Sequence, residues 1–141
     1  MSELDICCFD EDYEELLKTE VGRRWGLKKT GDLEVTATIP AKDEQFFVAR
    51  LRWRAYPSGV PSLKFLDDAG NDTNPMAWPT GQGFRPGSLD TCMHWTQEGH
   101  VLHPAWAGVA AYRLDPAGNP LAQAIDFLQH WFIHEYQGRH K

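Results

Sequence analysis

Three cysteines in 141 residues are too few, and too poorly spaced, to form a disulfide framework. Cys7 and Cys8 are adjacent, and adjacent cysteines can hardly bridge each other without strain. One thiol is always left over, whichever pair is considered. We therefore expect reduced thiols in a reducing compartment.

The sequence also lacks a hydrophobic run long enough to cross a membrane, and its first residues lack the basic start and apolar run of a signal peptide. Basic residues are not in excess either: the sequence has 14 Lys and Arg and 20 Asp and Glu, which gives a formal net charge of -6. Nucleic acids and anionic membranes attract basic surfaces, so neither is expected as a partner. The sequence indicates a cytoplasmic protein and no cofactor.

What the sequence does contain is material for a packed core. Hydrophobic residues make up 42% of the chain, with six Trp, seven Phe and four Tyr. A chain of this length suits one domain with a real core and is short for two. We therefore expect a single domain over residues 1–141.

The first half of the chain predicts a helix followed by strands. Residues 10–21 have an N-cap candidate in Asp10, an acidic first turn and a single apolar face, and Gly22 is expected to end this helix. Apolar and polar residues then alternate over 33–39, 45–56 and 62–66, separated by turn residues. Consecutive strands with short connections indicate an antiparallel meander.

Three arginines, Arg50, Arg52 and Arg54, recur on the polar side of the second predicted strand. Such a row can hold an anionic partner. A solvated sheet face that neutralises nearby acidic residues is the more common explanation, and it is the one we expect.

The second half of the chain begins with a segment that is rich in helix and strand breakers. Residues 74–87 contain three Pro and three Gly, so we expect a long loop without regular elements, packed on the core through its Met, Trp and Phe side chains. The chain closes with a helix over 120–136, with Asn119 as N-cap and Pro120 at the first position. The predicted fold class is therefore α+β.

Residues 88–106 place Cys92 close to His94, His100 and His103. A thiol beside imidazoles has three interpretations: a nucleophile tuned by its neighbours, a metal ligand, or a buried small hydrophobe. His94 and His103 are candidates for tuning the thiol or relaying a proton, because imidazole titrates in the working pH range. Both could equally be hydrogen-bonded parts of a loop scaffold.

A further pair, His130 and His134, is spaced four residues apart on the predicted closing helix. Two histidines at this spacing can share a metal ion. Since no third ligand or glutamate motif lies near them, we interpret both as ordinary surface residues.

The order of elements, together with the residues Tyr56, Pro57, Pro61, Leu63 and Phe65, resembles the ubiquitin-conjugating (UBC) fold. These residues are similar to that family's Tyr-Pro-x-x-x-Pro-x-Val-x-Phe signature. The resemblance spans roughly residues 10 to 138 and implies a UBC-like domain with an N-terminal helix, an antiparallel meander, a long active-site loop and a C-terminal helix.

The resemblance also assigns places to three later segments. Trp78-Pro79-Thr80 stands near the family's His-Pro-Asn tripeptide, Cys92 at its thioester cysteine, and His103-Pro104-Ala105 at its Trp-Ser-Pro-Ala segment. The tripeptide asparagine is absent here, and the loop that leads to Cys92 is longer than usual. The first predicted helix is acidic where many members are basic, which implies a different or diverged activating partner.

The activity implied by the resemblance is that of an enzyme that conjugates a ubiquitin-like protein. Cys92 accepts the modifier's C-terminal carbonyl from an activating enzyme as a thioester and passes it to an amine of a protein acceptor. The pattern is most similar to divergent bacterial members, some of which are linked to antiphage defence. Two alternatives remain: a non-catalytic module of the same fold that binds a ubiquitin-like protein, and a zinc-binding protein that uses Cys92 and the nearby histidines.

Overall fold

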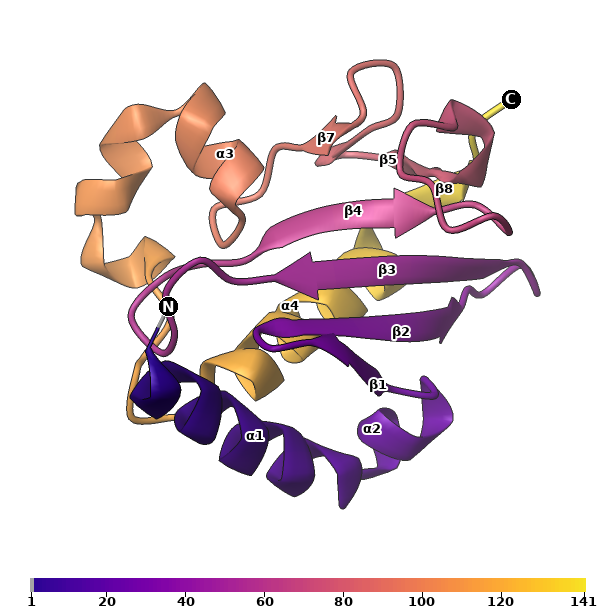
Figure 1. Ribbon diagram of the computed structural model, residues 1–141. Coiled ribbons are helices and arrows are strands. Elements are labelled where there is room, and N and C mark those ends of the chain that lie inside the picture. Colours follow the sequence, from indigo (N-terminus) through magenta and orange to yellow (C-terminus); the bar gives the residue numbers. More distant parts are fainter. Residues whose placement is uncertain (1) are drawn as a thin grey trace.

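The structure is a computed structural model that describes residues 2–141 (Figure 1). Its α-helices are α1 (Glu3–Leu17), α2 (Glu20–Arg24), α3 (Gln97–Leu102) and α4 (Pro120–His134). Its strands are β1 (Lys28–Gly31), β2 (Glu34–Pro40), β3 (Phe46–Arg52), β4 (Ser62–Leu66), β5 (Pro79–Gly81), β6 (Phe84–Arg85), β7 (Asp90–Thr91) and β8 (Tyr136–Arg139). Three 3₁₀ turns complete the elements: η1 (Pro75–Ala77), η2 (Pro104–Gly108) and η3 (Ala110–Tyr112).

The predicted α+β class, with an N-terminal helix, an antiparallel meander and a closing helix, is confirmed. Strands β1 to β4 form one antiparallel sheet in sequence order. The register pairs Ala37 with Ala49, and Ala49 with Phe65, so the buried residues of neighbouring strands lie side by side. The alternation in the sequence identified β2, β3 and β4, but it did not predict β1, whose four residues are all exposed.

The predicted bounds of the first helix were wrong. α1 begins at Glu3, where the Ser2 side chain accepts a hydrogen bond from the backbone N–H of Asp5, and it ends at Leu17. A second helix, α2, follows with Thr19 as its N-cap. Gly22 therefore lies inside α2, where a Cβ atom would stand 2.1 Å from the carbonyl oxygen of Leu16. Close packing, and not helix termination, requires glycine at this position.

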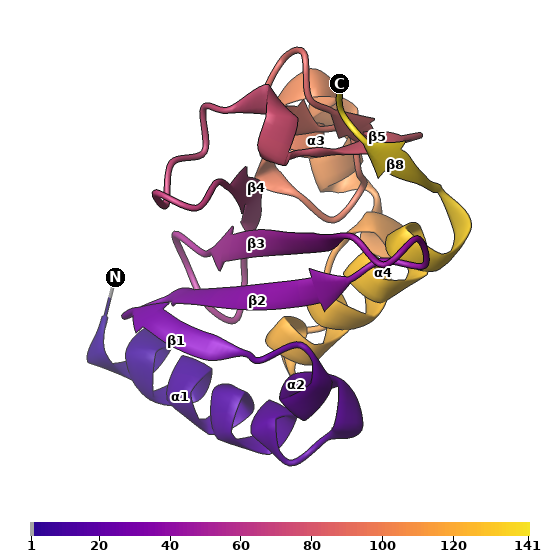
Figure 2. The same cartoon turned by 90° about the vertical axis from the view of Figure 1, so that its right-hand side faces the viewer.

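Helices α1 and α4 cover the sheet on its inner side: α1 runs along the β1 edge, and α4 lies behind the strands in Figure 1 and to their right in Figure 2. Inward side chains of β2, β3 and β4 meet Phe9 and Leu16 from α1 and a stripe of residues from α4. That stripe consists of Leu121, Ala124, Ile125, Leu128 and Phe132. Within residues 2–141, no helix combines the length and the apolar character needed to cross a membrane.

Tyr56 joins α1 to the beginning of α4. Its hydroxyl donates a hydrogen bond to the carboxylate of Asp12 and accepts one, at 3.2 Å, from the buried backbone N–H of Leu121. Asn119, the N-cap of α4, donates a second bond from its side-chain amide to the backbone carbonyl of Asp12. The phenol is itself 1% exposed, and burial and the bond to Asp12 raise its pKa above the ordinary value.

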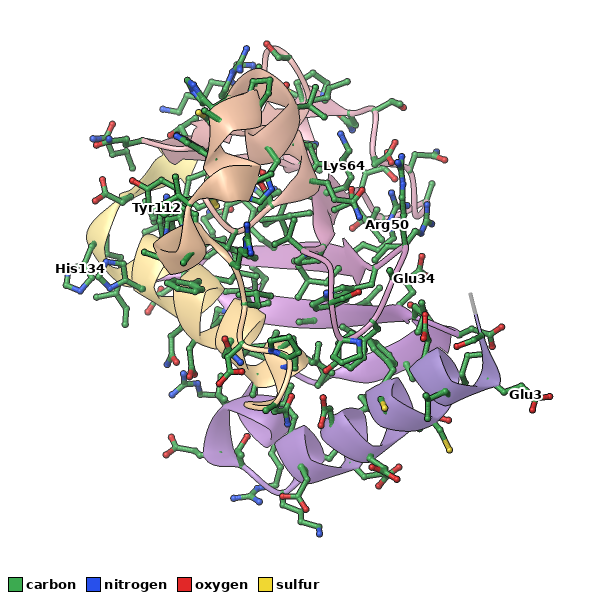
Figure 3. All side chains as sticks on the ribbon, turned by 90° about the vertical axis from the view of Figure 1, so that its left-hand side faces the viewer. Glu3, Glu34, Arg50, Lys64, Tyr112 and His134 are labelled. Carbon is green, nitrogen blue, oxygen red and sulfur yellow. The ribbon has the colours of Figure 1, made fainter. Side chains whose placement is uncertain are left out.

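The other face of the sheet carries no helix, and Figure 3 shows Glu34, Arg50 and Lys64 projecting from it. Arg50 pairs with Asp72 at 2.7 Å, and Arg52 pairs with Glu34 at the same distance. This is the charge-balanced face that the row of arginines predicted. Arg54 lies beyond the end of β3.

The part of the segment after β4 that carries β5, β6 and β7 lies above the β4 edge of the sheet, and the chain after α3 descends beside the ends of the strands to α4 (Figures 1 and 2). The prediction that residues 74–87 contain no regular element was wrong in detail, because η1, β5 and β6 lie there. These elements are very short: β5 pairs with β8 near the end of the chain, and β6 pairs with the nearby β7 in a hairpin. The aromatic residues of the segment do pack as expected, since Trp78 is fully buried and Phe84 is 5% exposed.

Candidate functional site

Cys92 follows directly after β7. Its backbone N–H donates a 2.8 Å hydrogen bond to the carbonyl oxygen of Gly83, which extends the pairing of β6 with β7 by one step. Thr91 is fully buried and Met93 is 1% exposed, whereas Cys92 and His94 are half-buried. Cys92 is thus the first residue after the β6–β7 pairing, and His94 already lies in the turn that leads to α3.

The thiol of Cys92 is free, and no side chain in the part of the chain that the structure describes forms a hydrogen bond with it. Within residues 2–141, no hydrogen bond joins its sulfur to His94, to His103 or to any carboxylate. The chemistry expected of the two histidines therefore stays a prediction.

His94 lies in an aromatic environment. Its ring centroid is 4.8 Å from that of Phe127, 5.1 Å from that of Tyr112 and 5.8 Å from that of Trp131. Its Nδ1 atom is buried and has no hydrogen-bond partner among the described residues. The pKa of His94 is lowered, first because burial disfavours the imidazolium ion and second because His100 lies nearby. A neutral ring at neutral pH follows from this shift.

Of the other two histidines of the segment, His100 contacts its backbone and His103 lies on its surface. The Nε2 atom of His100 lies 2.7 Å from the carbonyl oxygen of His94, which fixes the turn after Cys92. His103 is exposed and stacks on Trp106, with ring centroids 4.2 Å apart. The structure thus brings His94 and His100 together, while His103 lies beyond α3 against a different aromatic residue.

The zinc alternative requires at least three ligands around one point. Among residues 2–141, no group of three or more His, Cys, Asp or Glu side chains is arranged to hold a metal ion. Cys92, His94, His100 and His103 are close in sequence but point toward different neighbours. His130 and His134 are exposed and have ring centroids 4.3 Å apart.

The segment Trp78-Pro79-Thr80 makes its polar contacts with the end of the chain. The Trp78 carbonyl accepts a hydrogen bond from the backbone N–H of His140, and the Thr80 hydroxyl donates one to the carbonyl of Gly138, both at 2.9 Å. These bonds attach β8 to β5. The hydrogen bonds of this segment are therefore structural.

A pocket of about 480 Å³ lies beside His94, and the sequence did not predict it. Its lining consists of His94, Gln123, Asp126, Phe127, His130 and Trp131. Five of these residues come from α4, where the sequence singled out only His130, interpreted as an ordinary surface residue. The distance between His94 and α4 along the chain concealed the pocket, because only the folded chain brings the two together.

Comparisons with known proteins give no family for this chain. No protein-family model, no curated protein and no solved structure matches it.

Proposed function

We propose that this protein conjugates a ubiquitin-like modifier to an amine through a thioester on Cys92. The observation that carries the proposal is the placement of Cys92: a half-buried, free thiol directly after β7, two residues before the His94 that lines an aromatic pocket. The meander, the Tyr56-Pro57 corner and the closing helix support it, because they follow the order expected from the UBC resemblance.

The reaction needs one residue that forms a covalent bond with the modifier. The Cys92 thiolate attacks the carbonyl carbon of the thioester on the activating enzyme, and the thiolate of that enzyme leaves. An amine of the acceptor then attacks the new thioester, loses a proton, and the Cys92 thiolate leaves as the amide forms. His94 lies two residues after Cys92, and its neutral ring is in the form that accepts a proton.

The test is an adduct assay with the cognate activating enzyme, its modifier and ATP. We expect an adduct of protein and modifier that a reducing agent cleaves and that Cys92→Ala abolishes. Cys7→Ser and Cys8→Ser, which change the two cysteines of α1, are the matched controls and should retain the adduct. An adduct that persists in Cys92→Ala, or that vanishes in either control, contradicts the assignment of Cys92.

The second candidate is a non-catalytic module that binds a ubiquitin-like protein. It is favoured by one observation: within residues 2–141, no hydrogen bond joins the Cys92 sulfur to an imidazole or a carboxylate. On this reading Cys92→Ser leaves the cellular function and the binding of the modifier intact. Loss of function in Cys92→Ser, with the fold and expression unchanged, excludes the module.

A further inference from the structure

A second pocket lies where the end of α2, the end of β2 and the last turns of α4 meet. Figure 2 shows α2 below the end of β2, with α4 beside it. We call it the α2–α4 pocket, and its lining includes Arg24, Trp25, Lys42, Gln129, Phe132 and Ile133. Its volume of about 450 Å³ is within the range of roughly 300–1,000 Å³ that is typical of small-molecule sites. Neither Cys92 nor His94 lines it, so its ligand is a separate question from the conjugation proposed above.

The interior of the α2–α4 pocket is apolar. Trp25 and Phe132 line it and are themselves almost fully buried, so they form its floor. Ile133 lines it closer to the solvent and is 57% exposed. A ligand that contacts both rings and covers Ile133 removes apolar surface from water, which favours the binding of an apolar body.

The walls of the α2–α4 pocket are fixed by contacts within the protein. The carbonyl oxygen of Trp25 accepts a 2.6 Å hydrogen bond from the backbone N–H of Thr38, which joins the end of α2 to β2. Phe132 contacts Phe47 of β3, with ring centroids 5.6 Å apart, which joins the end of α4 to the same sheet. A ligand therefore meets a preformed site, and little binding free energy is lost in ordering the protein.

Two cations stand at the edge of the α2–α4 pocket, although the chain as a whole has a net charge of -6. Lys42, from the turn between β2 and β3, is exposed and forms no ion pair among the described residues. Arg24, the last residue of α2, pairs with Glu20 at 3.4 Å, and both side chains are exposed. An exposed pair of this kind contributes little, so an anion in the pocket can replace Glu20 as the partner of Arg24.

No acidic residue in the described part of the chain lines the α2–α4 pocket. Asp43 follows Lys42 directly, but both of its carboxylate oxygens lie within hydrogen-bond distance of the Tyr136 hydroxyl, at 2.9 and 2.8 Å. This contact turns the carboxylate toward β8. Gln129 adds to the lining a side-chain amide, which offers donors and an acceptor. The pocket therefore combines an apolar interior with positive charge at its edge.

We propose that the α2–α4 pocket binds a small amphipathic anion: a carboxylate or sulfonate attached to an aromatic ring system or a short aliphatic chain. The apolar body lies on Trp25 and Phe132 and covers Ile133, and the acidic group pairs with Lys42 and Arg24 at the edge. This site goes beyond the conjugation of a modifier, and it stands whether or not Cys92 forms a thioester.

Four probes test the two halves of the ligand separately by NMR. 1-Naphthaleneacetate carries the ring and a negative charge, 1-naphthaleneacetamide carries the ring alone, 1-naphthylethylammonium carries the ring and a positive charge, and acetate carries the negative charge alone. Each probe is titrated into ¹⁵N-labelled protein. The side-chain amide signals of Gln129 report on the pocket and are identified by their loss in Gln129→Met.

We expect naphthaleneacetate to shift the Gln129 signals in a saturable way, and acetate and the ammonium compound to leave them in place. Because an exposed ion pair is worth at most a few fold in affinity and two are formed, the Kd of naphthaleneacetamide should be about tenfold higher than that of naphthaleneacetate. Added salt should narrow this difference, since it screens exposed charges. Equal Kd values for the three naphthalene compounds, or the absence of any saturable shift, overturn the proposal.

Two double variants separate the pocket from general changes of charge. Lys42→Gln combined with Arg24→Gln should raise the Kd of naphthaleneacetate to that of the amide. Lys28→Gln combined with Arg54→Gln removes the same charge at exposed positions that do not line the pocket, and it should change the Kd by less than about twofold. An equal rise of the Kd in the two double variants overturns the proposal.

A second matched pair tests the apolar part of the α2–α4 pocket. Ile133→Glu places a carboxylate where the apolar body of the ligand is expected, and it should abolish the shift caused by naphthaleneacetate. Val101→Glu makes a similar replacement at an exposed position of α3 and should leave the shift unchanged. The urea midpoint of each variant shows that its fold is retained. An undiminished shift in Ile133→Glu overturns the placement of the ligand, and with it the proposal.

Discussion

Removal of one hydroxyl group, in Tyr56→Phe, should uncouple α1 from α4. The hydroxyl donates to the Asp12 carboxylate and accepts the buried backbone N–H of Leu121. A hydrogen bond to a charged group contributes about 1.5–3 kcal/mol, and a buried N–H left without an acceptor costs about 1–3 kcal/mol. Because the two effects share one hydroxyl and overlap, we expect the free energy of unfolding to fall by about 2–4 kcal/mol.

Urea titration followed by tryptophan fluorescence measures this loss. With a slope of about 1.5 kcal/mol/M, a typical value for small proteins, the midpoint should move down by about 1.3–2.7 M. Tyr13→Phe is the matched control, because its hydroxyl donates only a long bond of 3.4 Å to the Leu27 carbonyl and accepts one from the exposed backbone N–H of Lys29, and it should cost less than about 1 kcal/mol. A loss below about 1 kcal/mol in Tyr56→Phe, or equal losses in the two variants, would refute the reasoning.

Two further predictions concern the segment around Cys92. Burial lowers the pKa of His94 in the folded protein, so the unfolded chain binds a proton at this residue more readily than the folded protein does. The free energy of unfolding should therefore fall as the pH drops below the ordinary histidine pKa of about 6.5. His94→Gln should make this pH dependence shallower in urea titrations at several pH values, whereas exposed His134→Gln should not; identical slopes in all three proteins would contradict the shift. Gly99→Ala should lower the free energy of unfolding by about 2 kcal/mol, because the new Cβ would stand 1.9 Å from the carbonyl oxygen of Met93. Gly108→Ala, where nothing lies within 4 Å, should change it by less than about 0.5 kcal/mol, and equal effects in the two alanine variants would argue against crowding at Gly99.

Short-range sequence patterns predicted three of the strands and the start of the closing helix. The alternation of apolar residues identified three strands, and Asn119 with Pro120 marked the start of α4. The first helix shows where this reasoning failed. Both Ser2 and Asp10 have side chains suited to an N-cap, and the acidic run after Asp10 resembles a first turn. The Ser2 cap places Ile6 and Phe9 in the helix, and Phe9 contributes a fully buried ring to the core.

The candidate site was predicted only in part, for a physical reason. Cys92 and His94 are only two residues apart, so the sequence alone indicated that they belong to one region of the fold. The directions of His100 and His103 depend on the helical turn of α3, which sends one imidazole to a backbone carbonyl and the other to Trp106. Sequence spacing alone could not separate these outcomes. The pairing of β5 with β8 also lay beyond local patterns, because it joins residues more than fifty positions apart.

The position of α4 in the chain determines when the core can close during synthesis. Roughly fifty residues separate the end of β4 from the start of α4, so at about 5–20 residues per second the ribosome needs about 3–10 s to make them. During that interval the meander can pair its strands, but its apolar inner face still lacks the helix that covers it. The nascent chain therefore spends seconds as a half-covered sheet. At this stage it exposes the largest apolar surface to which a chaperone could bind.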